Sequence, residues 1–147
     1  MKKLLILGGT AQQIKLVEAA KKRGIYTIVT DYLKDSPAKK IADKAYIYDI
    51  KDIDGIVAMC QKEQVNAVIC GYIDPCQRPY QQICERLQIP CYGTKEQFFK
   101  MTDKHAFKKM CVENGVDVIP EYSERDIEKN CIEYPVFVKP VDSRGSR

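Results

Sequence analysis

The sequence predicts an α/β protein: a Rossmann-like open parallel sheet followed by a small α+β segment. Up to Gly93, short apolar or β-branched runs alternate with segments of helical periodicity, which is the pattern of successive βαβ units. Beyond Gly93 the pattern changes to short charged helices and a proline-bounded extended run. Strands joined through helices form parallel sheets with right-handed crossovers. We therefore expect one domain over residues 1–94 and the beginning of a second over residues 95–147.

The first half of the sheet follows from three short runs. Residues 4–8 form an apolar run that ends in glycine, as a strand buried on both faces does. A helix is expected over residues 11–23, with an apolar arc along one side and a stop at Gly24. The β-branched run 26–31 predicts the second strand, and residues 45–49 predict the third.

The second half of the sheet alternates in the same way. The next helix carries apolar residues at positions i, i+3, i+4 and i+7, which are Ile53, Ile56, Val57 and Cys60. Residues 67–71 predict a fourth strand, again ending in glycine. The same template then recurs in Tyr80, Ile83, Cys84 and Leu87. Residues 90–93 can supply a short fifth strand.

The second segment is expected to begin with two short helices, opened by Thr94 and by Thr102. The pair at 114–115, Asn-Gly, ends the second of them in the usual manner of a helix stop. The charged residues 123–129 predict another short helix. Residues 134–140 are bounded by prolines and predict a strand.

The composition is that of a soluble globular protein, with 45% hydrophobic and 30% charged residues. The net charge of +4 falls well short of the basic stripe of a nucleic-acid-binding protein. The start lacks the features of a secretory signal, and no apolar run approaches the roughly 20 residues that span a bilayer. We therefore expect a cytoplasmic protein without nucleic-acid or membrane partners. Its seven cysteines include no CxxC pair and are expected to be reduced and mostly buried.

The turn Gly8-Gly9-Thr10 is a candidate anion site, because backbone N–H groups at a helix start attract negative charge. Asp31 ends the second strand, where an acid accepts ribose hydroxyls in a dinucleotide-binding fold. The glycine fingerprint of that fold is incomplete, since residues 11–13 are not glycines. A purely structural turn, a site for a non-nucleotide substrate and a nicotinamide site all remain open at this point.

Two lysines are further candidates. Lys104 lies in the expected first turn of a helix, where a cation opposes the helix dipole at a cost of roughly 0.3–1 kcal/mol. Such a cost points to a functional role, although a solvated surface lysine explains it equally well. Lys139 shares a strand face with Phe137, which suits a ligand cleft better than bulk water. The following residues, Ser143–Arg147, offer groups that wrap phosphates, or they form a frayed polar end.

Together these segments resemble the ATP-grasp superfamily of ligases. Residues 4–10 and 89–93 are similar to the domain that precedes an ATP-grasp fold. Residues 102–108, Thr-Asp-Lys-His-Ala-Phe-Lys, resemble the family's TDKxxFK segment. Residues 134–140 and 143–147 resemble its YPvvvKP strand and glycine-rich loop. Biotin carboxylase, the large chain of carbamoyl-phosphate synthase and the ATP-using carboxylases and ligases of purine synthesis are relatives.

The resemblance implies a reaction that phosphorylates a carboxylate to an acyl phosphate, which an amine, a thiol or another nucleophile then attacks. ATP and Mg²⁺ would be the cofactors, and the other ligand would be a small-molecule acid. The resemblance assigns the ATP contacts to Lys104, Lys139, Ser143, Arg144, Gly145 and Ser146. It assigns the acid substrate to Gly8, Gly9, Thr10 and Asp31. It names no catalytic residue in this stretch of sequence.

The family's adenine-binding strand and magnesium ligands come after the point where this sequence ends. We therefore expect the chain to be the N-terminal part of such a ligase, or the product of a split gene, without ligase activity of its own. A homodimer and a complex with a separately encoded C-terminal half are the candidate assemblies. A stand-alone nucleotide- or NAD-binding module is the alternative from another class, but it leaves the segments at 102–108 and 134–140 unexplained. A purely structural or interaction domain is a third reading.

Overall fold

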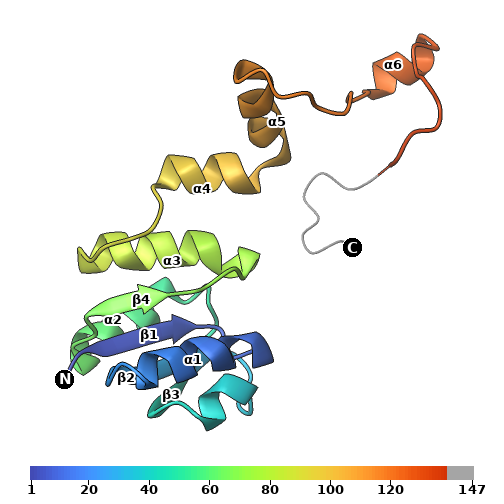
Figure 1. The fold of residues 1–147 in the computed structure, drawn as a ribbon. Coiled ribbons are helices and arrows are strands. Elements are labelled where there is room, and N and C mark those ends of the chain that lie inside the picture. The colour runs from blue at the N-terminus through green and yellow to red at the C-terminus, as the bar shows by residue number, and fades with distance from the viewer. Residues whose placement is uncertain (139–147) are drawn as a thin grey trace. The chain divides into compact units, whose positions relative to one another are not determined.

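The computed structural model describes residues 1–138 of the 147-residue chain. The chain divides into two compact units, Met1–Phe98 and Phe99–Arg147. The first unit is built on a four-stranded parallel sheet with the order β3-β2-β1-β4 (Figure 1). Its strands are β1 (Lys3–Leu7), β2 (Tyr26–Asp31), β3 (Lys44–Ile47) and β4 (Ala67–Ile69). The Rossmann-like α/β class predicted from the sequence is confirmed.

Strand β1 lies inside the sheet and pairs with β2 on one side and β4 on the other. Its Leu4 stands opposite both Thr27 and Ala67. The last three residues of β1 are buried, which explains why the strand reads as a continuous apolar run rather than an alternating one. Strand β3 pairs with β2 alone among the described residues and is mostly exposed, as expected of an edge strand.

Helical segments cover both faces of this sheet (Figure 1). One face carries a short 3₁₀ turn, η1 (Ala11–Gln13), the helix α1 (Ile14–Lys21) and the turn η2 (Pro37–Lys40). The other face carries α2 (Ile53–Glu63) and α3 (Asp74–Leu87). The predicted helix over residues 11–23 therefore begins as a 3₁₀ turn.

Two apolar clusters follow from the alternation of side chains along β1. Ile6 packs with Val17 of α1 and Ala38 of η2 on one face. Leu5 and Leu7 point to the opposite face and belong to the larger cluster formed with α2 and α3. The sheet is therefore buried between two layers, and its carboxyl edge is where loops and side chains can reach a ligand.

Four of the seven cysteines are buried in these layers, namely Cys60, Cys70, Cys76 and Cys84. Cys91 and Cys111 are half-buried, Cys131 is exposed, and all seven are free thiols. The prediction that most of the cysteines are buried is confirmed. Within residues 1–138, no helix combines the length and the apolar character needed to cross a bilayer.

Helix α4 (Lys95–Thr102) contains the boundary between the two units. The second unit continues with α5 (Lys104–Glu113) and α6 (Glu124–Glu128). The side chain of Asp103 caps α5 by accepting a 2.8 Å hydrogen bond from the N–H of Ala106. A capping box between Ser123 and Asp126 starts α6. The helices at 102–113 and 123–129 are thus confirmed, and neither α5 nor α6 buries a side chain in the described structure.

Two predicted strands are wrong. Residues 90–93 are irregular, because the N–H of Tyr92 donates to the side-chain hydroxyl of Tyr80 at 3.1 Å instead of to a neighbouring strand. Residues 134–138 form no strand either, since no segment among residues 1–138 pairs with them. Phe137 is 87% exposed there, and the remainder of the expected strand, from Lys139 on, lies outside the described residues.

Candidate functional site

The predicted substrate residues meet at the carboxyl edge of the sheet. The N–H of Gly8 donates to the carbonyl of Thr30 at 2.8 Å, which continues the β1–β2 pairing by one residue. The N–H of Gly9 donates to Oδ2 of Asp31 at 2.6 Å, and Oδ1 of Asp31 accepts from the N–H of Leu33 at 2.8 Å. Both carboxylate oxygens of Asp31 therefore fix backbone, and the turn after β1 is fastened to the end of β2.

Both glycines of this turn are needed for space. Gly8 has a φ of +85°, and a Cβ there would lie 2.8 Å from Cδ1 of Ile73. A Cβ on Gly9 would lie 2.5 Å from Cβ of Ser36 and 3.1 Å from Cβ of Asp31. The turn can pass this close to the end of β2 and to the following loop only because it carries no side chains.

A buried ammonium group lies directly behind Asp31. Lys39 of η2 is only 8% exposed, and its Nζ donates to the backbone carbonyls of Asp31 at 2.7 Å and Leu33 at 2.5 Å. Burial lowers the pKa of Lys39, while the negative charges of Asp31 and Asp35 oppose that shift. The ammonium therefore balances the carboxylate of Asp31 and holds the loop after β2 against the turn after β1.

A buried amide joins the same turn to the far side of β1. Gln13 is fully buried, and its Nε2 donates to the carbonyl of Cys70 at 3.2 Å. Its Oε1 accepts from the hydroxyl of Thr10 at 2.8 Å. The side chain of Gln13 thus spans from the start of the first helical segment to the end of β4. Buried glutamines are uncommon, because each amide must find partners for both of its ends.

The edge between β1 and β4 is where an open α/β sheet forms its ligand crevice. The chain runs outward from β1 to β2 and β3 and then returns to the other side of β1, so the direction of winding reverses between β1 and β4. Gly8 directly follows β1 on one side of this point. On the other side Gly71, with a φ of +61°, lies two residues after the end of β4. The hydroxyl of Tyr92 lies 3.0 Å from the carbonyl oxygen of Gly71 and 3.0 Å from Oε1 of Gln77.

The turn retains hydrogen-bond donors of its own. The N–H groups of Gly8 and Gly9 are used within the chain, and that of Gln13 donates to the carbonyl of Thr10. No other residue among 1–138 accepts a hydrogen bond from the N–H groups of Thr10, Ala11 and Gln12. These three amides, rather than those of the glycines, are the donors that the turn can offer to an anion.

The predicted nucleotide contacts are only partly described. Lys104 occupies the first turn of α5, directly after the capping Asp103, as expected from the sequence. Lys139, Ser143, Arg144, Gly145 and Ser146 lie outside the described residues. One residue beyond Lys104, Nδ1 of His105 lies 3.2 Å from Oε2 of Glu121, and Nζ of Lys108 donates to the same carboxylate at 2.9 Å.

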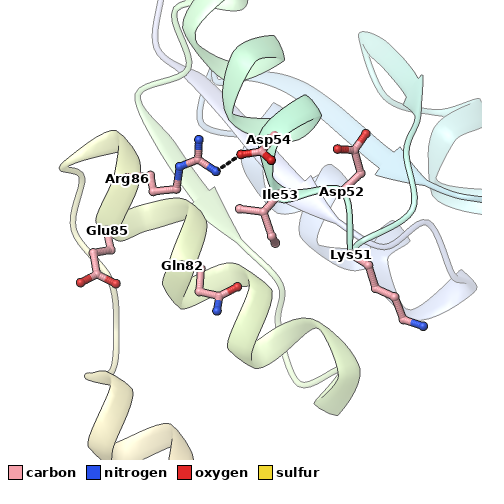
Figure 2. A pocket seen from close by; sticks show the side chains of 7 residues that line it. All are labelled: Lys51, Asp52, Ile53, Asp54, Gln82, Glu85 and Arg86. Carbon is pink, nitrogen blue, oxygen red and sulfur yellow. Dashed lines mark hydrogen bonds and ion pairs between the residues drawn. The ribbon is translucent and has the colours of Figure 1, made fainter.

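A separate hollow of about 420 Å³ lies between the start of α2 and the second half of α3 (Figure 2). An ion pair between Asp54 and Arg86 crosses it. Because this pair is exposed to water, it contributes little free energy. The hollow is lined by Lys51, Asp52, Ile53, Asp54, Gln82, Glu85 and Arg86, and none of the predicted site residues within 1–138 is among them.

The described part of the chain contains no group of three or more histidine, cysteine, aspartate or glutamate side chains that could hold a metal ion. Three sequence-distant residues complete the candidate site and were missed by sequence reasoning, namely Ser36, Lys39 and Tyr92. Lys39 belongs to a short basic stretch with Lys40, and nothing in the sequence distinguishes it from a surface lysine.

Comparison with known families settles the class. The model of the PylC-like N-terminal domain matches residues 4–78, which is just over half of the chain. The chain belongs to this family. The match runs from β1 into α3 and includes the turn after β1, Asp31, Lys39 and Gln13.

Individual proteins similar to this PylC-like domain agree with that class. The formate-dependent phosphoribosylglycinamide formyltransferase of Methanocaldococcus jannaschii is 31% identical over 67 residues, covering 46% of this chain and 17% of the formyltransferase. The structure of phosphoribosylglycinamide synthetase from Anaerococcus prevotii matches 96% of this chain and 37% of its own, with 25% identity and a TM-score of 0.69.

The biotin carboxylase domain of 2-oxoglutarate carboxylase from Hydrogenobacter thermophilus has the same fold, with a TM-score of 0.76 and 24% identity over 99% of this chain. That domain was solved with magnesium ADP and bicarbonate. The PylC-like chain spans 36% of it and about a sixth of the formyltransferase. These relatives confirm the resemblance to the N-terminal portion of ATP-grasp ligases.

Proposed function

We propose that this PylC-like chain forms the acid-substrate crevice, and part of the ATP-phosphate contacts, of a ligase that works through an acyl phosphate. The observation that carries the proposal is the hydrogen bond from the N–H of Gly9 to the carboxylate of Asp31. This bond fixes the turn after β1 next to the point where the direction of winding reverses, between β1 and β4. Open α/β sheets bind ligands at that point. Membership of the PylC-like family supports the assignment of this edge to a ligase rather than to another α/β enzyme.

The substrate side of the proposal rests on Gly8, Gly9, Thr10 and Asp31. The glycines allow close approach of a ligand, and the N–H groups that follow them can hold a carboxylate or another anion. Asp31 keeps the turn in place through its bond to Gly9. Asp31 can also accept a hydrogen bond from an amine or a hydroxyl of the ligand, because each carboxylate oxygen has more than one lone pair.

On the nucleotide side, we propose that Lys104, with Lys139 and the loop at 143–146, contacts the phosphates of ATP. ATP supplies the phosphoryl group that activates the acid, and lysines neutralise the charge that develops on the phosphates. The chain spans only part of each relative that it matches, so we further propose that turnover needs residues beyond the matched portion. A separately encoded C-terminal half would supply them, and a homodimer is the other assembly that we propose for this chain.

A titration followed by amide NMR tests the substrate side. The full chain is titrated with formate, acetate, succinate and bicarbonate, with sodium chloride at equal ionic strength as the control. We expect residue-specific shifts at the amides of Thr10, Ala11 and Gln12 with at least one of the carboxylates or bicarbonate. Shifts no larger than those caused by chloride would count against an acid site at this turn.

The alternative is an NAD-binding module without ligase activity. Asp31 stands where such a module would bind ribose hydroxyls, but residues 11–13 lack the further glycines of the dinucleotide-binding fingerprint. In the same titration NAD should leave the amide of Asp31 unshifted, whereas a tight NAD complex would favour the alternative. ATP hydrolysis by residues 1–147 with any candidate acid would contradict the expectation that the chain is inactive alone.

A further inference from the structure

Helix α3 ends in a turn that brings the following loop back over the helix. Gln88 adopts a left-handed conformation with a φ of +54°, and the N–H of Ile89 donates to the carbonyl of Cys84 at 3.1 Å. Three residues later the N–H of Tyr92 donates to the hydroxyl of Tyr80 at 3.1 Å. The loop is therefore anchored to the helix at two successive turns.

These anchors place a second thiol beside the first. Tyr80 and Cys84 are four residues apart and lie on the same face of α3. Cys91 immediately precedes Tyr92, whose ring stacks on that of Tyr80 with 4.4 Å between centroids. Cys91 consequently packs against the cluster that contains Cys84 and Tyr80, close enough to influence the pKa of both side chains.

The two thiols differ in their access to solvent. Cys84 is fully buried in the larger apolar cluster, whereas Cys91 is half-buried at the margin of that cluster. A small reagent in solution can therefore reach Cys91 first.

We propose that Cys84 and Cys91 form a modification site, at which a hydroperoxide converts the two thiols into an intramolecular disulfide that a dithiol reductant reopens. No large movement is required, because the loop is bonded to α3 at Cys84 and at Tyr80, and Cys91 packs against the cluster that contains Cys84. The disulfide would close the short loop 84–91 and hold Tyr92 on Tyr80. It forms next to Tyr92 of the candidate site, but it does not depend on the proposed function.

The oxidation proceeds in two balanced steps. In the first, the thiolate of Cys91 attacks one oxygen of the hydroperoxide, the O–O bond breaks, and the other oxygen leaves as an alcohol or as water after taking up a proton. Cys91 is then a sulfenic acid. In the second step the sulfur of Cys84 attacks that of Cys91, the S–OH bond breaks, and the hydroxide leaves as water with the proton of Cys84. Each sulfur has lost one electron, and the peroxide has gained two.

The burial of Cys84 decides the order of these steps. Burial raises the pKa of the Cys84 thiol to about 12, so this thiol stays protonated and reacts slowly with peroxide. Cys60 of α2 is also buried, and burial raises its pKa to about 12 as well. Cys60 therefore offers a matched control: a thiol of similar burial in the same apolar cluster that should not take part.

The test uses the full chain, reduced and then treated with hydrogen peroxide. After alkylation and digestion, mass spectrometry should find a peptide joining Cys84 to Cys91, lighter by two hydrogens and restored by dithiothreitol. The cross-link should be intramolecular, so that non-reducing gel electrophoresis shows no chain of doubled mass. Dimedone should label Cys91 persistently in Cys84→Ala, because the sulfenic acid can no longer be resolved. Cys60→Ala should give the cross-link at the wild-type yield.

Three outcomes would overturn the proposal. One is a folded protein, treated with peroxide, in which these two cysteines are still alkylated separately. Another is a disulfide joining Cys91 to a different cysteine, such as Cys70. A third is dimedone labelling of Cys84 rather than Cys91. If Cys84→Ala does not fold by circular dichroism, Cys91→Ser, a change at a half-buried position, must abolish the cross-link and leave Cys84 free for alkylation after unfolding.

Discussion

The backbone N–H of Gly9 donates a 2.6 Å hydrogen bond to the carboxylate of Asp31, across the boundary between the first two strands. The other oxygen of the same carboxylate accepts from the N–H of Leu33. One side chain thus determines both the turn that opens the first helical segment and the path of the chain beyond β2. The shape of the candidate substrate site depends on this contact.

Replacing Asp31 should therefore destabilise the first unit. Asp31→Ala removes two hydrogen bonds to a charged acceptor, and we expect a loss of about 1–3 kcal/mol in the free energy of unfolding. Asp31→Asn should lose less, because its amide oxygen can still accept one bond. Urea denaturation measures both. The control is Asp49→Ala, which removes one exposed 2.9 Å bond from the N–H of Lys51 after β3. Equal losses for Asp31→Ala and Asp49→Ala would contradict this account.

Gly9→Ala should destabilise the protein for a steric reason. The new Cβ would overlap Ser36 at 2.5 Å, and overpacking of this kind costs roughly 1–3 kcal/mol. Because the nearest atom is Cβ of Ser36, the change Ser36→Gly should relieve part of that cost. A double-mutant cycle by thermal or urea unfolding measures the coupling. If the free-energy changes of Gly9→Ala and Ser36→Gly simply add in the double variant, the new Cβ of residue 9 does not press on the Cβ of Ser36.

Tyr92→Phe tests the contact between the loop after α3 and the end of β4. The change removes the hydroxyl that lies beside Gly71 and Gln77 but keeps the ring that stacks on Tyr80. We expect a loss of about 0.5–1.5 kcal/mol. We also expect faster labelling of Cys70, whose sulfur lies 2.8 Å from the same hydroxyl.

The control for Tyr92→Phe is Tyr72→Phe. Tyr72 is 63% exposed in the loop between β4 and α3, so this change should alter the unfolding free energy by less than about 0.5 kcal/mol. If both variants label Cys70 at the wild-type rate, the Tyr92 hydroxyl does not protect that thiol.

The stability of the protein in acid should depend on Asp43. Hydrogen bonds from the backbone N–H of Thr27, then from its hydroxyl and from Lys21, hold the pKa of Asp43 below 3.8. A depressed pKa stabilises the fold fully above the unfolded value, and that contribution is lost as the pH falls through the folded value. The free energy of unfolding of the wild type should therefore exceed that of Asp43→Asn at neutral pH, and this difference should disappear below about pH 4.

Urea unfolding of the two proteins between pH 2.5 and pH 7 measures this difference. Lys21→Met provides a control, since it removes the ion pair with Asp43 but leaves both bonds from Thr27. Because the backbone bond is the largest cause of the shift, this variant should keep most of the pH dependence. If the difference in the free energy of unfolding between wild type and Asp43→Asn did not change with pH, the ionised carboxylate of Asp43 would not be the source of the acid sensitivity.

The fold could be predicted because its local and global signals agree. Residues 26–31 have the β-branched content of a strand and form β2 with those bounds. The apolar template at residues 53–60 lies in α2, and the start of α5 follows the capping role of Asp103. In each case the residues that determine the element lie within it.

The rest depended on contacts between distant residues. The extended character of residues 90–93 suggested a strand. A strand ladder would need the N–H of Tyr92, which instead donates to the hydroxyl of Tyr80. Lys39 reads as part of a basic surface loop, and only the folded chain buries it behind Asp31. Gln13 was considered only as a missing glycine, although its amide connects the turn after β1 to the end of β4.

The side-chain amide of Gln13 also determines in which direction the hydroxyl of Thr10 donates its proton. A backbone carbonyl such as that of Cys70 can only accept, so the end of the Gln13 side chain facing it must be the NH₂ group. The opposite end is then the oxygen, which obliges the hydroxyl of Thr10 to donate its proton inward. Towards a bound molecule, Thr10 presents lone pairs alone. A ligand group that touches this hydroxyl must bring its own proton, as an ammonium or an alcohol does, while the neighbouring amides serve its negatively charged part.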